Sequence, residues 1–269
     1  MKRLAAIILA AGQSKRMGQP KMVLPWGANT VLGQVIEVYG TALKTDGGTD
    51  FETEKRIERA NRGTDFGTEK RIERANRGTD FETEKRRERA NGGTDFETEK
   101  RIEKADWEAE KRIPETEIII VTGGAREIVE AEAMRWAGKF AVRCVHNPGY
   151  ESSGMLESLQ CGLAELKAEV EATLIGPGDQ PQLSLSAARA VVAAFERSGA
   201  RIVVPSQALR RGHPWLVRRD FWPELLALRP PQTLRDFLTA HAAEILYVET
   251  DQTVLKDLDT PEDYRREKP

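Results

Sequence analysis

The chain has 269 residues, of which 39% are hydrophobic and 31% are charged, and its formal net charge is −2. This near-neutral balance gives no support to nucleic acid or an anionic membrane as a partner, and no apolar stretch approaches the ~18–20 residues that a membrane span needs. Two cysteines and three scattered histidines fit neither a disulfide framework nor a metal-ligand motif, so the composition indicates a cytoplasmic globular protein.

The chain begins with an apolar run, LAAIILA at residues 4–10, which predicts a buried strand. The loop after it is small and basic. Its small residues at 10–12 let a flat ligand approach the backbone closely, and Arg16 and Lys21 supply positive charge for phosphate oxygens. The spacing fits neither the dinucleotide-binding glycine motif nor the P-loop.

A helix is expected over residues 30–43, and a tandem repeat follows it. From Gly48 the sequence repeats a 15-residue unit, GTDFETEKRIERANR, with little change until Pro114. Each unit predicts a short helix, but its few apolar residues cannot bury a core as solenoid repeats do. We interpret residues 48–114 as a solvated, helical or disordered insertion between two parts of one domain, 1–47 and 115–269. A partner-binding arm is the alternative.

After the insertion, apolar runs alternate with helical segments. The predicted strands are 117–123, 140–146, 171–177, 201–206 and 244–250, and the predicted helices are 125–137, 154–166, 185–198 and 234–241. This alternation predicts a single Rossmann-like α/β domain with a mainly parallel sheet and helices on both faces. Such sheets bind ligands beyond the carboxyl ends of their strands, and the insertion, between a helix and the next strand, belongs to the opposite edge.

Two acidic segments lie where they could serve such a site. The strand 171–177 leads into PGDQP, which places Asp179 beyond a strand's carboxyl end. A carboxylate there, facing the basic loop, could hold Mg²⁺ between itself and the phosphates of a nucleotide. Near the end, VLKDLDTPEDY carries Asp257 and Asp259 on an extended segment, and Thr260 is expected to cap the last helix. Turn and capping chemistry alone would also explain these residues.

Taken together, these segments resemble the MobA-like NTP transferase family. The resemblance rests on L-A-A-G-x-S-x-R-M-G-x-P-K at 9–21, N-P-x-x-x-x-G-M at 147–155, G-D-Q-P at 178–181, R-G-H-P at 211–214 and D-x-D-T-P-E-D-Y at 257–264. It covers the chain except for the repeats, in the family's order. G-D-Q-P together with R-G-H-P is similar to the molybdenum cofactor cytidylyltransferases within that family.

The resemblance implies a Mg²⁺-dependent nucleotidyltransferase that moves a nucleotidyl group from a nucleoside triphosphate to a phosphorylated acceptor such as molybdopterin and releases pyrophosphate. L-A-A-G is similar to the cytidine-using branch, which implies CTP. By the same resemblance, the nucleotide is bound by Leu9, Ala10, Ala11, Gly12 and Ser14, its triphosphate and the reaction depend on Arg16, Lys21 and Asp179, the metal is held by Asp179 and Asp259 with Asp257 behind them, and the acceptor side includes Gly154 and His213.

Two departures leave the acceptor open. G-M-L-E-S-L at 154–159 puts Glu157 where the family commonly has a hydroxyl, and PPQTLRDFL at 230–238 replaces another common loop. A sugar phosphate or another small phosphorylated molecule is therefore an alternative acceptor. An alternative of another class is a non-catalytic nucleotide- or cofactor-binding protein that aids maturation of a molybdoenzyme, its candidate partner. The complete set of Arg16, Lys21 and Asp179 favours catalysis.

Overall fold

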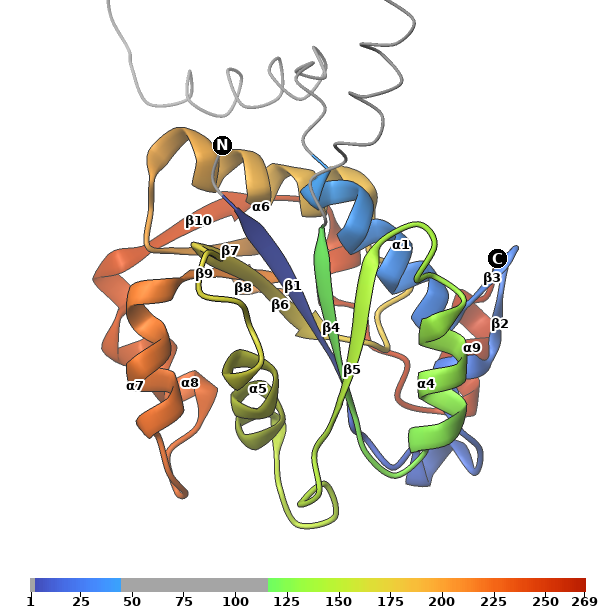
Figure 1. Ribbon diagram of the computed structural model, residues 1–269. Coiled ribbons are helices and arrows are strands. Elements are labelled where there is room, and N and C mark those ends of the chain that lie inside the picture. Colours follow the sequence, from blue (N-terminus) through green and yellow to red (C-terminus); the bar gives the residue numbers. More distant parts are fainter. Residues whose placement is uncertain (1–2, 45–115) are drawn as a thin grey trace, which may run out of the picture. The chain divides into compact units, whose positions relative to one another are not determined.

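The computed structural model describes residues 3–44 and 116–269. The predicted insertion at 48–114 lies outside these residues, so it stays a prediction. The two described segments, together, form the α/β domain that the sequence predicts (Figure 1).

Within the described residues, eight strands form one sheet in the order β10-β7-β9-β6-β1-β4-β5, with β8 paired to β7. Its parallel strands are β1 (Leu4–Ala10), β4 (Glu117–Thr122), β5 (Ala141–His146), β6 (Ala172–Pro177), β7 (Ile202–Gln207) and β10 (Ile245–Glu249). These are the six predicted strands, with ends shifted by one residue at most. The mainly parallel sheet is therefore confirmed.

Two short strands make the sheet mixed. β9 (Trp215–Arg218) lies antiparallel between β6 and β7, and β8 (Arg210–Arg211) pairs antiparallel with the end of β7. β9 is antiparallel to both of its neighbours, so β6 and β7 run in the same direction as each other. Since β6 is parallel to β1, the carboxyl ends of all three strands lie at the same edge of the sheet.

Helices cover both faces of the sheet (Figure 1). One face is covered by α1 (Val31–Leu43), α4 (Arg126–Met134) and α6 (Leu185–Ser198), and the other by α5 (Met155–Ala164), α7 (Trp222–Ala227) and α8 (Leu234–Ala240). Side chains of a strand alternate between faces: Ala6 and Ile8 of β1 pack toward α1, whereas Ala5 and Ile7 pack toward α5. Burial on both faces explains why β1 is apolar at every position.

The last helix lies against the loop that follows β1. α9 (Pro261–Glu267) is capped by Thr260, whose side chain accepts a hydrogen bond from the Asp263 amide, as the sequence predicts. Tyr264 of α9 donates its hydroxyl hydrogen to the Pro25 carbonyl oxygen at 2.5 Å. Pro25 begins the small hairpin of β2 (Pro25–Trp26) and β3 (Asn29–Thr30). The contact brings the segment before α9 alongside the basic loop.

The remaining described elements are short 3₁₀ helices: η1 (Lys15–Met17), η2 (Lys21–Val23), η4 (Arg219–Phe221), η5 (Ala242–Glu244) and η6 (Gln252–Leu255). Cys144 and Cys161 are free thiols. In the described part of the chain, no helix combines the length and apolar character that a membrane crossing requires.

Candidate active site

Three segments meet at the carboxyl end of the sheet. The Gly178 amide donates a hydrogen bond to the Leu9 carbonyl oxygen at 2.9 Å, which joins the ends of β6 and β1. The Leu258 amide donates to the Asp179 carbonyl oxygen at 3.2 Å, which adds the segment before α9. The backbone therefore fixes the basic loop and the two acidic segments side by side.

Lys21 lies at the centre of the charged residues. Its ammonium pairs with the Asp179 carboxylate, donates to the Leu258 carbonyl oxygen at 3.2 Å and lies 4.0 Å from Asp259 Oδ1. The side chains of Lys21 and Asp179 are only 12% and 15% exposed, so this pair is shielded from solvent. Arg16, on the exposed side, pairs with Asp259 Oδ2 at 3.2 Å. The sequence-predicted cations and carboxylates thus form one continuous chain of charges.

Asp257 lies next to the charged cluster of Arg16, Lys21, Asp179 and Asp259. Its Oδ1 accepts a hydrogen bond from Gln180 Nε2 at 2.6 Å. Burial raises the pKa of the Asp257 carboxyl, and the negative charges of Asp179 and Asp259 raise it further, although the Gln180 hydrogen bond acts in the opposite direction. Three carboxylates therefore share one region in which their mutual repulsion favours a cation. Sequence reasoning missed the role of Gln180 in orienting Asp257, although the residue belongs to G-D-Q-P.

The loop after β1 leaves room beside its backbone. Leu9, Ala10 and Ala11 are buried at the end of the strand, whereas nothing lies within 4 Å of where a Cβ on Gly12 would be. Ser14 has a positive φ of 50°, and its hydroxyl oxygen accepts a hydrogen bond from the Lys21 amide at 3.3 Å. Ser14 therefore holds the loop in the shape that brings Lys21 back toward the sheet.

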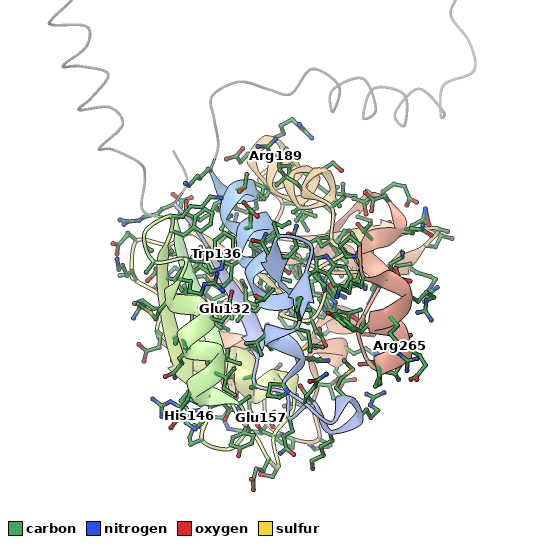
Figure 2. All side chains as sticks on the ribbon, turned by 90° about the vertical axis from the view of Figure 1, so that its right-hand side faces the viewer. Glu132, Trp136, His146, Glu157, Arg189 and Arg265 are labelled. Carbon is green, nitrogen blue, oxygen red and sulfur yellow. The ribbon has the colours of Figure 1, made fainter. Side chains whose placement is uncertain are left out.

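Gly154 and His213 are not joined to this cluster by any hydrogen bond or ion pair among the described residues. The Gly154 amide, at the start of α5, donates to Glu157 Oε2 at 2.8 Å. Figure 2 shows Glu157 at the same end of the molecule as His146, the last residue of β5. The start of α5 thus lies at the same end of the molecule as the carboxyl end of β5, and a carboxylate of the chain itself already caps it.

His213 lies beside β6, just before β9, the strand that pairs with β6. Its ring stacks on Trp215 with 4.8 Å between the ring centroids, and burial lowers the pKa of His213 to about 4. Its Cβ is 3.5 Å from where a Cβ on Gly176 of β6 would lie. His213 is therefore a neutral, buried ring beside the strand that carries Asp179.

The cluster fits a divalent metal that is shared with a ligand. Among the described residues, no group of three or more histidine, cysteine, aspartate or glutamate side chains is arranged to hold a metal alone. Mg²⁺, however, usually takes one or two carboxylates together with phosphate oxygens. The Lys21 ammonium already lies between Asp179 and Asp259, so these two carboxylates converge on a position that favours a cation.

The chain matches one protein family over most of its described length. Residues 6–45 and 109–245 match the MobA-like NTP transferase domain. No curated protein is similar enough in sequence to count as a match.

Several solved structures share the fold. Rv0371c from Mycobacterium tuberculosis H37Rv is 22% identical, with a TM-score of 0.61, over 99% of this chain and 97% of that one, and a further structure of Rv0371c is a manganese complex. A nucleotidyl transferase from Methanothermobacter (Mth528) is 18% identical, with a TM-score of 0.60, over 100% of this chain and 97% of that one. CMP:2-keto-3-deoxy-manno-octonic acid synthetase, in complex with CTP, is 11% identical, with a TM-score of 0.58, over 98% and 96% of the two chains.

At these identities the structural likenesses establish the fold alone, whereas the sequence match establishes the family. The chain therefore belongs to the MobA-like NTP transferase family of nucleotidyltransferases.

Proposed function

We propose that the protein is a Mg²⁺-dependent cytidylyltransferase that transfers CMP from CTP to a phosphorylated acceptor, molybdopterin, and releases pyrophosphate. The observation that carries the proposal is the chain of charges from Arg16 through Asp259 and Lys21 to Asp179. It lies at the carboxyl edge of the sheet, beside the open backbone at Gly12. A cytoplasmic location, where CTP is available, is part of the proposal.

The proposed reaction needs positioning and neutralisation of charge. An oxygen of the acceptor phosphate forms a bond to the α-phosphorus of CTP, and the bond from that phosphorus to the bridging oxygen breaks as pyrophosphate leaves. The acceptor phosphate is already a nucleophile, so no activated serine or cysteine is required. Lys21 and Arg16 offer positive charge to the triphosphate, and the cluster as a whole places that charge before the reaction begins.

The metal would be held by Asp179 and Asp259, with Asp257 behind them. When bound, Mg²⁺ would neutralise the negative charge that develops on the phosphate oxygens. Lys21 now occupies the space between the first two carboxylates. We infer that with a metal held there, the Lys21 ammonium would be available to the nucleotide phosphates. The manganese complex of the structurally similar Rv0371c is consistent with a divalent ion in this fold.

The choice of CTP and molybdopterin rests on the motifs rather than on contacts. L-A-A-G at 9–12 motivates CTP, and G-D-Q-P together with R-G-H-P motivates molybdopterin. Gly154 and His213 are the proposed acceptor residues. Glu157 occupies the helix N-terminus of α5, where an acceptor phosphate could otherwise bind. This supports a sugar phosphate or another small phosphorylated molecule as the alternative acceptor.

The test is pyrophosphate release measured for CTP and GTP, with molybdopterin or sugar phosphates as acceptors, with and without Mg²⁺. We expect turnover that requires Mg²⁺ and a higher kcat/KM for CTP than for GTP. An equal or reversed nucleotide preference would contradict the choice of CTP. Binding of a nucleotide with no turnover on any acceptor would favour the non-catalytic alternative.

A variant tests the assigned carboxylate. Asp179→Asn should keep the fold, because the asparagine oxygen can still accept from Lys21, but should lower kcat by at least ~10²-fold, as loss of a charge-stabilising group commonly does. Asp220→Asn is the matched control: Asp220 pairs with Arg201 and Arg218 near the amino end of the sheet, away from the site. Normal turnover by folded Asp179→Asn protein would show that Asp179 is not a metal ligand in the reaction.

A further inference from the structure

A small apolar cluster joins the basic loop after β1 to the acidic segment before α9. It is separate from the apolar residues that fill the two faces of the sheet, and we call it the loop core. Tyr264 of α9 packs against it, with its ring centroid 6.3 Å from that of Trp26. The buried members of the loop core are Met17, Leu24, Trp26, Val31 and Leu258.

Leu258 is the member of the loop core that comes from the acidic segment. Its side chain is completely buried, and in the sequence it lies between Asp257 and Asp259. Its amide donates a hydrogen bond to the Asp179 carbonyl oxygen at 3.2 Å, and its carbonyl oxygen accepts one from the Lys21 ammonium at 3.2 Å. One residue therefore contacts the basic loop, the end of β6 and the apolar cluster at the same time.

The charges of the acidic segment are a weak means of holding it in this place. Its two carboxylates, Asp257 and Asp259, lie in one region with Asp179, and like charges repel. The ion pair between Arg16 and Asp259 opposes that repulsion, but the two side chains are 70% and 45% exposed, and exposed ion pairs contribute little to stability. Complete burial of a leucine side chain contributes more than such a pair. The packing of Leu258 is therefore the stronger attachment.

We infer that Leu258 is a positioning residue of the site: by packing into the loop core it holds Asp257 and Asp259 beside Asp179 and keeps the basic loop in place against them. A metal and a nucleotide would then meet carboxylates and cations that are already assembled. The part of the inference that concerns the metal rests on the proposed function. The ordering of the basic loop by Leu258 does not, and it is measurable in the protein without ligands.

Leu258→Ala removes most of this packing without changing a charged residue. Hydrogen exchange of residues 13–24 is measured without metal or nucleotide, and CTP binding is measured by calorimetry at a series of Mn²⁺ concentrations, without acceptor. Both are measured well below the unfolding temperature. We expect residues 13–24 to exchange about tenfold faster than in the wild type, because the loop opens more often. We expect the Mn²⁺ concentration for half-maximal CTP binding to rise by about tenfold or more, as loss of a group that orients metal ligands commonly causes.

Leu225→Ala is the matched control. Leu225 belongs to α7, is 1% exposed and packs among the apolar residues on one face of the sheet. Both alanine variants should unfold at a lower temperature, because each leaves a cavity, but Leu225→Ala should leave the exchange of residues 13–24 and the Mn²⁺ requirement unchanged. Leu258→Met, which keeps the volume, should also resemble the wild type.

Leu258→Val makes a smaller cavity and provides the same comparison if Leu258→Ala does not fold. Exchange of residues 13–24 within about twofold of the Leu225→Ala rate in these Leu258 variants would overturn the inference, because other contacts would then order the loop. Faster exchange with an unchanged Mn²⁺ requirement would overturn it as well, since the packing would then have no effect on metal binding. If the wild-type protein shows no metal-dependent CTP binding, the proposed function fails, and the exchange rates alone decide whether Leu258 orders the basic loop.

Discussion

Gly176 and Gly12 both lie near the proposed active site, but only Gly176 is closely surrounded by other side chains. A Cβ on Gly176 would lie 2.1 Å from the Tyr39 hydroxyl oxygen and 3.5 Å from His213 Cβ. A Cβ on Gly12 would meet nothing within 4 Å. The absence of a side chain at Gly176 therefore makes room for the buried Tyr39 ring. The absence of a side chain at Gly12 leaves space in which the proposed nucleotide could approach the backbone.

We predict that Gly176→Ala lowers the free energy of unfolding by about 1–3 kcal/mol, the usual cost of overpacking a core. Tyr39 is completely buried, and close packing around it opposes any displacement of its ring. Adding Tyr39→Phe to the same chain should restore most of the loss, because it removes the atom that the new methyl group would strike. Urea unfolding of the two single variants and the double variant measures this coupling.

Gly12→Ala serves as the control for that cycle. It should leave the unfolding free energy near the wild-type value and weaken only nucleotide binding. Strictly additive effects of Gly176→Ala and Tyr39→Phe would show that the two residues do not collide.

Residues that carry charge were easier to predict than residues that support them. Lys21 and Asp179 could be brought together from the sequence because strand-end loops of a parallel sheet share one edge, whereas Asp259 was placed beside them only by the resemblance to the family. The motif containing Gln180 was visible, but its hydrogen bond to Asp257 depends on a segment 77 residues away.

At the scale of elements, long apolar segments were predictable and short ones were not. All six predicted strands form, and α6 spans residues 185–198 as expected. The four residues of β9 and the six of α7 are too few to show a period. β9 is formed through tertiary contacts, because it pairs with β6 on one side and with β7 on the other.

One side chain links α7 to the end of α8. His241 Nε2 lies 2.9 Å from each carboxylate oxygen of Glu224 in α7, and Nδ1 lies 2.8 Å from Glu244 Oε1. Burial opposes a charge on His241, but hydrogen bonds to Glu224 and Glu244 outweigh it, so the pKa of His241 is raised. The protonated ring therefore donates to both carboxylates and holds the two helices together.

This link should make stability depend on pH. A raised pKa in the folded state means that the contribution is complete below the unfolded value of about 6.5 and is lost as pH rises through the folded value. We predict that the loss of stability caused by His241→Asn is larger at about pH 5.5 than at about pH 9. Urea unfolding of both proteins at both pH values measures it. A loss that does not change with pH would mean that the ring acts only by packing on its neighbours.

At the scale of the whole chain, the family match and the described structure are interrupted over overlapping ranges of residues. The match stops at residue 45 and resumes at 109, and the described structure runs to residue 44 and resumes at 116. The flanking elements, α1 and β4, meet this gap at the amino edge of the sheet, where Glu117 pairs with Ala5. The charged cluster is at the carboxyl edge. Arg16, Lys21 and Asp179 therefore lie in the two parts that match the family, whereas Asp257 and Asp259 lie in the described segment after residue 245, where the match ends.

We therefore predict that residues 48–112 can be replaced by a short Gly/Ser linker without loss of fold or activity. The free-energy cost of closing a surface loop grows only slowly with its length, so shortening the loop changes stability little. The value of kcat/KM should stay within about threefold of wild type, a difference of roughly 0.65 kcal/mol in activation free energy. Pyrophosphate release and thermal unfolding of the shortened and complete chains measure the two effects. Loss of folding or turnover in the shortened chain would mean that the repeats pack on the domain, and the interpretation of residues 48–114 as an insertion without a catalytic role would be wrong.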